Sequence, residues 1–194
     1  MMCRPCATAV SDRRRKPEVS ALSFTRPEYP SDKAARYALL LEQADALTDG
    51  IDHPMASLAN IAALLGQGLP DINWVGFYLM DDGSLLLGPF YGLPACIRIP
   101  LSRGVCGAAA RTDSVQRIAD VHAFPGHIAC DSASNSEIVL PIHAQGRVVG
   151  VLDIDSPLLS RFDETDERCL QQLVHLLERR CDFGQTAYRT GIAE

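Results

Sequence analysis

Apolar residues recur at helical spacing in three segments of the chain, which begin near Ser31, after Pro54 and near Asp163. Gly50 ends the first segment and Arg180 ends the last. A repeat of three to four residues places side chains on one face of a helix, so each segment predicts an amphipathic helix packed against a core. The repeating positions are Tyr37, Leu40, Leu41, Ala44 and Leu47, then Leu58, Ile61, Ala62 and Leu65, then Leu170, Leu173, Val174 and Leu177.

Between the second and third of these segments, the pattern changes to short apolar runs separated by turn residues, which is typical of strands. Two pairs of runs are joined by tight turns, at 81–83 and 144–146, and the first of these pairs predicts a β-hairpin. The segment GVCGAAAR (104–111) predicts a short helix that begins at a glycine. The expected strands are 73–80, 84–88, 96–99, 115–119, 137–143 and 147–155.

This order of elements predicts one α+β domain with a central antiparallel sheet. We expect the terminal helices to pack together on one face of the sheet, and the long excursion from Gly88 to Glu137 to lie over the other face. Residues 1–25 carry the basic run RRRK, scattered Ser and Pro and no apolar period, so we expect a disordered extension there. The domain itself is expected to span 31–182, followed by a C-terminal tail at 183–194.

Composition argues against several classes of function. The 194 residues are 47% hydrophobic and 22% charged, which is typical of a globular domain. The net charge of -6 does not suggest the basic face that nucleic-acid binding needs. Because no apolar run approaches the ~20 residues that cross a bilayer and no secretory signal is recognisable, we expect a cytoplasmic protein with neither nucleic-acid nor membrane partners.

The chain has seven cysteines, which in a reducing compartment are catalytic, metal-binding or inert rather than a disulfide framework. Zinc sites use closely spaced ligand pairs, and the one such pair, Cys3 and Cys6, has no matching second pair. We therefore predict no metal. The seven are Cys3, Cys6, Cys96, Cys106, Cys130, Cys169 and Cys181.

Three of the cysteines, Cys96, Cys106 and Cys130, fall within the long excursion. Cys130 lies in the polar run HIACDSASNSE (127–137) after a Pro-Gly turn, a setting that suits an accessible thiolate better than a core thiol. Cys106 lies at a predicted helix N-terminus, where the helix dipole can lower the pKa of a thiol. This concentration favours redox or nucleophilic chemistry over three cysteines that merely fill apolar gaps.

Carboxylates and aromatic side chains gather on the predicted strands. Asp153 and Asp155 are two residues apart and so share one face, and Glu137 begins the neighbouring strand. Such carboxylates form a solvated strand end, meet a cation or ligand, or raise one another's pKa until one donates a proton near neutral pH. Trp74 and Tyr78, four residues apart, share a face that is either core or the apolar wall of a pocket.

Seven blocks between Asn73 and Ser156 carry a family resemblance. They are NWVGFY (73–78), GPF (88–90), ACIRIP (95–100), GVCGAA (104–109), ADVHAFPGHIACD (119–131), SNSEIVLP (134–141) and GVLDIDS (150–156). Together they closely resemble the free methionine-(R)-sulfoxide reductases, enzymes built on a single GAF domain. The resemblance implies the same domain here, and it extends more weakly over residues 31–180.

The resemblance implies a thiol-dependent reaction that converts free L-methionine (R)-S-oxide to L-methionine. Cys130 matches the attacking thiol, which becomes a sulfenic acid, and Cys96 matches the thiol that condenses with it into an intramolecular disulfide. Cys106 matches a third cysteine of the family, an alternative resolving thiol. Thioredoxin, supplied with electrons by NADPH and thioredoxin reductase, would restore the thiols, and no bound cofactor is expected.

The resemblance also gives roles to the acidic and aromatic residues. Glu137, Asp153 and Asp155 match the acidic cluster that polarises or protonates the sulfoxide oxygen. Trp74 would wall in the S-methyl group, and Tyr78 would support the pocket. By analogy with related domains, a homodimer through the helical face is expected.

Two other interpretations stay open. A GAF module can sense a small molecule without turnover, and FDE (162–164) is similar to a signature of cyclic-nucleotide-binding GAF domains; a helix cap in DETD (163–166) explains the same residues better. A metal site could use Cys130, His127 and His122, but it would lack the closely spaced thiols of zinc clusters. Methionine release, nucleotide binding and stoichiometric zinc would distinguish the three.

Overall fold

The computed structural model describes residues 27–51, 53–128 and 131–185. The expected N-terminal extension, including Cys3 and Cys6, lies outside these ranges, and so does most of the expected C-terminal tail. Cys130 also lies outside the described residues.

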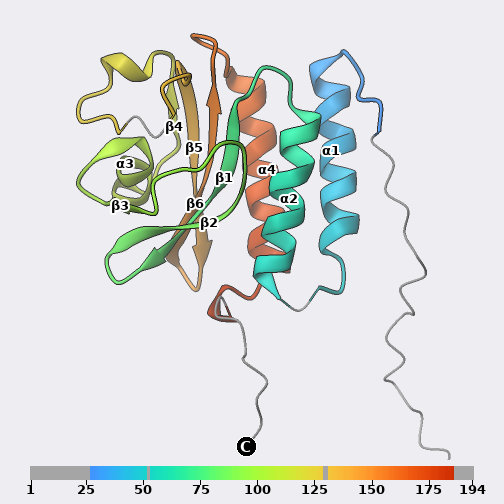
Figure 1. Ribbon diagram of the computed structural model, residues 1–194. Helices are drawn as coiled ribbons and strands as arrows, with labels where there is room; N and C mark the ends of the chain where they lie inside the picture. Colours follow the sequence, from blue (N-terminus) through green and yellow to red (C-terminus); the bar gives the residue numbers. More distant parts are fainter. Residues whose placement is uncertain (1–26, 52, 129–130, 186–194) are drawn as a thin grey trace, which may run out of the picture.

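A six-stranded antiparallel sheet forms the centre of the domain, in the order β3-β2-β1-β6-β5-β4 (Figure 1). The two predicted strand pairs are both hairpins, and β1 and β6 join them into one sheet. Their tight turns use Gly83 and Gly146 in the left-handed region, with φ of 74° and 73°, which glycine adopts without a steric penalty. The strands are β1 (Trp74–Asp81), β2 (Ser84–Tyr91), β3 (Arg98–Pro100), β4 (Gln116–Ile118), β5 (Ser136–Ala144) and β6 (Arg147–Ser156).

Helices α2 and α4 cover one face of the sheet, α1 packs over these two helices, and the excursion with the short helix α3 covers the other face (Figure 1). The predicted α+β architecture is thus confirmed. In the described ranges, no helix combines the length and the apolar character that crossing a membrane requires. The helices are α1 (Lys33–Thr48), α2 (Pro54–Gly68), α3 (Gly104–Thr112) and α4 (Glu164–Arg180), with 3-10 turns η1 (Val121–Ala123) and η2 (Phe183–Gln185).

The N-terminus of α4 is fixed by a capping box. The Oδ1 atom of Asp163 accepts hydrogen bonds from the backbone N–H groups of Thr165 (2.8 Å) and Asp166 (3.1 Å), while Asp166 Oδ2 accepts one from the N–H of Asp163 (2.9 Å). These bonds satisfy N–H groups that have no partner within the helix. The predicted cap therefore accounts for the FDE triplet at 162–164.

The side chains of strand β1 alternate between two hydrophobic cores, one on each face of the sheet. Val75 and Phe77 belong to a large cluster that the long helices cover, called here the helix-side core. Trp74 and Tyr78 alternate with them and belong to a smaller cluster under α3, called here the site-side core. The same alternation on β6 turns Asp153 away from the helices, because successive side chains on a strand point to opposite faces.

Candidate active site

Three carboxylates, called here the acidic cluster, converge on the site-side face of the sheet. Glu137 pairs directly with Asp155 across β5 and β6, and Asp153 lies two positions away on β6. Residues two apart on a strand, and residues paired across strands, share a face, so the sheet itself brings the three together. Glu137 and Asp153 each expose only 6% of their surface, whereas Asp155 is half-buried.

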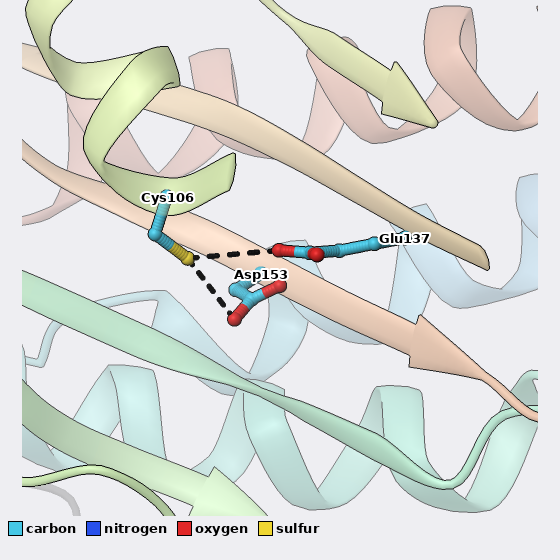
Figure 2. Close-up of side chains that lie close together, drawn as sticks. All are labelled: Cys106, Glu137 and Asp153. Carbon is cyan, nitrogen blue, oxygen red and sulfur yellow. Dashed lines mark hydrogen bonds between the residues drawn. The ribbon is translucent and has the colours of Figure 1, made fainter. Parts of the chain in front are cut away.

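Helix α3 places a thiol over two of these carboxylates. Cys106 lies in its first turn and points down onto the strands, as Figure 2 shows. Its Sγ atom is 3.1 Å from Oδ2 of Asp153 and 3.9 Å from Oε1 of Glu137. The thiol hydrogen is thus shared between two acid groups, and Cys106 lines the pocket beside them.

Burial raises the pKa of all three carboxyl groups, because removal from water disfavours the charged form. The pKa of Asp153 rises to about 6. The pKa values of Glu137 and Asp155 lie well above their usual range, since the neighbouring carboxylates add repulsion to the effect of burial. No ion pair to the cluster occurs among the described residues. The cluster therefore holds protons near neutral pH.

The expectation that the helix dipole lowers the pKa of Cys106 is wrong. Burial raises the pKa of this thiol well above its usual range, and Asp153 and Glu137 raise it further. A helix N-terminus contributes about 0.3–1 kcal/mol to the stability of a nearby anion, which is small beside the cost of a thiolate buried against carboxylates. At neutral pH the thiol form of Cys106, which donates a hydrogen bond, is therefore favoured over the thiolate.

An aromatic stack forms the wall of the site. The Trp74 ring lies between those of Phe90 and Tyr78, with centroid distances of 5.5 and 5.9 Å. The indole Nε1 donates to the carbonyl of Leu93 (3.1 Å), and the Tyr78 hydroxyl donates to the carbonyl of Cys96 (3.0 Å). The predicted shared face is confirmed, and the two rings also hold the loop that carries Cys96.

A pocket lies between this wall and the acidic cluster. All the described residues of the predicted site line it except Cys96, whose carbonyl accepts the hydrogen bond from the Tyr78 hydroxyl. The pocket includes residues from the loop after η1 that were not singled out from the sequence. It is lined by Trp74, Tyr78, Pro94, Ala95, Ile99, Gly104, Val105, Cys106, His127, Ile128, Asp131, Ser134, Glu137, Asp153 and Asp155.

Asn73 ties this loop to the sheet, a role that sequence reasoning missed. Its Nδ2 donates to Oδ2 of Asp131 (2.8 Å) and to Oγ of Ser134 (3.0 Å). Asp131 Oδ1 also accepts the N–H of Ala133 (2.9 Å), which makes a tight local turn. Both Asn73 and Asp131 stand inside the recognised blocks, but no periodicity or spacing joins residues 58 positions apart.

The cysteines differ in state. Cys96 is disulfide-bonded, whereas the other cysteines of the described residues, Cys106, Cys169 and Cys181, are free thiols. Cys130 lies outside the described residues, but the nearest described residues on either side of it, Ile128 and Asp131, both line the pocket.

Two sets of side chains carry atoms that can bind a metal ion. Cys106, Glu137 and Asp153 have ligand atoms within 4.8 Å of one another and are the one such group in the ranges described. A cation there would have to displace the protons that these groups hold. His122 and His127 are not part of the group: their rings meet edge to face at 6.3 Å, and His122 Nε2 contacts Oδ1 of Asn135 (3.0 Å).

Comparison with known proteins agrees with this geometry. A family profile for the GAF domain matches residues 55–179. The chain is 57% identical over 150 residues to Protein YtsP of Bacillus subtilis, covering 76% of this chain and 92% of that protein. It is 55% identical over 148 residues to the free methionine-R-sulfoxide reductase of Escherichia coli, covering 76% of this chain and 90% of that protein.

The fold is also similar to solved structures. One is the X-ray structure of free methionine-R-sulfoxide reductase from Neisseria meningitidis in complex with its substrate. It superposes with a TM-score of 0.77 at 45% identity, covering 82% of this chain and 95% of that chain.

Proposed function

The chain belongs to the free methionine-(R)-sulfoxide reductase family of GAF-domain proteins, and from that premise we propose that it reduces free L-methionine (R)-sulfoxide to L-methionine with its own thiols. The observation that carries the proposal is a buried acidic cluster, in which burial raises the carboxyl pKa values, facing an aromatic wall. A sulfoxide oxygen leaves sulfur only when it is protonated, and a sulfonium-like methyl group is stabilised against an aromatic face.

In the first half-reaction the Cys130 thiolate attacks the sulfoxide sulfur while Glu137 or Asp153 protonates the oxygen. The S–O bond breaks and the oxygen passes to the Cys130 sulfur, so methionine leaves and Cys130 is oxidised to a sulfenic acid. The raised pKa of Glu137 supports this role most directly, because an acid that still carries its proton near neutral pH can donate it, whereas Asp153, whose pKa rises to about 6, is protonated in a smaller fraction of molecules. Trp74 encloses the methyl group, and the surrounding pocket excludes methionine residues within polypeptides.

In the second half-reaction the Cys96 thiol condenses with the sulfenic acid, which forms a disulfide and releases water. Two observations support Cys96 over Cys106 as the resolving thiol. Cys96 is disulfide-bonded, and its partner is not Cys106, Cys169 or Cys181, which are free. Moreover, burial and then its carboxylate neighbours raise the pKa of Cys106, which disfavours the attacking thiolate form.

An external dithiol then restores the two thiols by exchange. We assign this step to thioredoxin, kept reduced by thioredoxin reductase and NADPH, and we place the reaction in the cytoplasm, where such reductants are maintained. The homodimer expected by analogy stays a prediction, which light scattering of the purified protein would test.

The test supplies each epimer of free methionine sulfoxide, and a peptide containing methionine sulfoxide, with thioredoxin, thioredoxin reductase and NADPH. We expect methionine from the free R epimer alone. Cys130→Ser should abolish product, and Cys96→Ser should allow one turnover and then stop, whereas Cys169→Ser, a thiol of the helix-side core, should act like the native protein. A Cys130→Ser protein that cycles at the native rate would refute the proposal, and binding of the sulfoxide without any turnover would favour a sensor.

A further inference from the structure

Apolar side chains are exposed around Cys96. Phe90, Leu93 and Ile97 expose 38%, 62% and 71% of their surfaces. These three, called here the Cys96 patch, lie within eight consecutive positions, whereas the neighbouring Tyr91 turns its ring toward Gly66 of α2 on the other face of the sheet. Large apolar groups gathered in this way mark a surface that another molecule covers, whereas single ones are ordinary.

The patch is held in place by the site itself. The Leu93 and Cys96 carbonyls accept the bonds from Trp74 and Tyr78, and the Ile97 carbonyl accepts one from the N–H of Leu87 (2.9 Å). Three hydrogen bonds within five residues fix the loop, so the apolar side chains are presented without a large ordering cost on binding.

The charged residues in the segment around the patch are all basic. The chain has a net charge of -6, yet residues 88–112 contain no Asp or Glu and three arginines. Arg98 is ion-paired with Asp81, while Arg103 and Arg111 are exposed and have no carboxylate partner within the described residues. A partner with an apolar contact face and acidic groups at its rim would complement this surface.

We propose that the Cys96 patch is the docking surface for the protein dithiol that regenerates the enzyme. This inference rests on the proposed function, which requires such a reductant, and it adds where that reductant binds. The partner's thiolate attacks the Cys96 sulfur and releases the other sulfur of the disulfide as a thiolate. The partner's second thiol then attacks the mixed disulfide and releases Cys96, so that two electrons pass to the enzyme and the partner leaves oxidised; the partner's two thiol protons end on the released sulfurs.

The position of Cys96 within the patch favours a redox partner over a second copy of the chain or the substrate. Cys96 is half-buried in the middle of the patch, so whatever covers Leu93 and Ile97 is brought against the disulfide. Contacts of this kind between redox partners are small and short-lived, which a three-residue apolar patch suits better than the large surface that a stable dimer needs. Substrate entry does not explain the patch, because free methionine sulfoxide is zwitterionic.

The test compares two reductants on the double variant Leu93→Ser/Ile97→Ser. Serine keeps the backbone carbonyls that hold Trp74 and Leu87, and both side chains are exposed, so the fold should persist. With thioredoxin as the probe, we expect kcat/KM for the reductant to fall at least tenfold, mainly through KM. With saturating dithiothreitol, a small dithiol that needs no docking surface, the rate should stay within twofold of the native rate.

Leu159→Ser is the matched control, because Leu159 is 60% exposed, close to Leu93. Its neighbour Ser160 bonds to Ala119 next to β4, at the opposite edge of the sheet from β2 and β3. This variant should behave natively with both reductants. Arg103→Glu should weaken thioredoxin use at low salt and have little effect at high salt.

Each outcome separates the two proposals. An unchanged kcat/KM for thioredoxin in the double variant would overturn the docking surface while leaving the reductase intact. An equal loss with thioredoxin and dithiothreitol would place the two residues in substrate binding and would also overturn it. If the native protein formed no methionine with either reductant, the proposed function itself would fail.

Discussion

Two buried carboxylate sites lie on opposite faces of the same sheet, and they solve the problem of burial differently. On the helix side, the fully buried carboxylate of Asp166 accepts hydrogen bonds from the Tyr37 hydroxyl (2.8 Å), from Lys33 (2.7 Å) and from Arg161 (3.1 Å). On the site side, Asp153 is buried almost as deeply, but its neighbours are a thiol and other carboxyl groups, and its Oδ1 atom has no hydrogen-bond partner.

The difference separates a structural carboxylate from a chemical one. Two cations and a hydroxyl compensate the buried charge of Asp166, and they join α4 to α1 and to the loop before α4. No cation among the described residues pairs with the acidic cluster, and the Cys106 thiol is a weak donor, so burial raises the carboxyl pKa values. Buried polar atoms without partners are destabilising, which makes the cluster costly to the fold and useful to the reaction.

The largest expected effect removes the acid from the site side. Glu137→Gln and Asp153→Asn keep the shape of each side chain but cannot donate a carboxyl proton, so we expect the rate of methionine formation to fall by about 10²–10⁴-fold each. Thermal unfolding should show that both variants stay folded. Glu164→Gln, an exposed residue at the start of α4, is the matched control and should keep the native rate. If either site variant kept more than half of the native rate, its carboxyl group would not be the acid that the comparison assigns to the site side.

The corresponding change on the helix side should affect stability instead. Asp166→Asn leaves Lys33 and Arg161 facing a neutral amide, and we expect it to lower the free energy of unfolding by about 3–5 kcal/mol, the usual cost of breaking a buried ion pair. Urea unfolding measures this loss, and the folded fraction should still reduce the sulfoxide within about twofold of the native rate. A variant with native stability but little activity would reverse the assignment of the two sites.

Sequence periodicity predicted most of the fold, since it reports on local structure. The apolar repeats located α1, α2 and α4, and strand alternation placed Trp74 with Tyr78 and Asp153 with Asp155. Boundaries were less accurate. The strand expected at 84–88 runs on to Tyr91, because Gly88 and Pro89 form only an irregularity opposite Phe77, and pairing with β1 resumes at Phe90.

Contacts between distant residues could not be predicted in this way. Tyr37 and Asp166 are 129 positions apart, and Asn73 and Asp131 are 58 apart, so no pattern along the chain relates them. The pKa of Cys106 was misjudged for the same reason. Its helix is visible in the sequence, but the two carboxyl groups beneath it, from β5 and β6, become neighbours only when the sheet forms.

A smaller expected effect is on the free energy of unfolding, because the destabilisation by the acidic cluster depends on pH. The pKa of Asp153 rises from 3.8 to about 6 on folding, so between these values the folded protein binds more protons than the unfolded chain, and stability falls as pH rises. A shift of this size corresponds to about 3 kcal/mol. Asp153→Asn should therefore match the native stability near pH 3 and become more stable than the native protein by pH 7.

Urea midpoints measured from pH 3 to pH 7 give this comparison directly. Asp82→Asn, at an exposed turn position, is the control for an aspartate-to-asparagine change and should follow the native curve. If Asp153→Asn were less stable than the native protein at pH 7, the native carboxylate would have a compensating partner, and the two buried sites would no longer differ in kind.

The smallest expected effect comes from Cys106, which distinguishes a hydrogen-bond donor from a resolving thiol. Cys106→Ser keeps an O–H donor toward Asp153 and Glu137, so we expect its steady-state rate to stay within about threefold of the native rate. Cys106→Ala removes the donor, and the loss of one buried hydrogen bond, about 0.5–1.5 kcal/mol, should lower the rate by up to about tenfold.

The two variants together decide the role of this thiol, because the alternatives predict different orders. A donor tolerates serine better than alanine, since serine can still share a hydrogen with the carboxyl groups beneath α3. A resolving thiol tolerates neither, and both variants would release one equivalent of methionine and then stop, as expected for Cys96→Ser. Single-turnover and steady-state rates, measured side by side with dithiothreitol, separate these cases. If both variants stopped equally after one turnover, Cys106 would be a resolving thiol, and its hydrogen bonds to the acidic cluster would not be its main role.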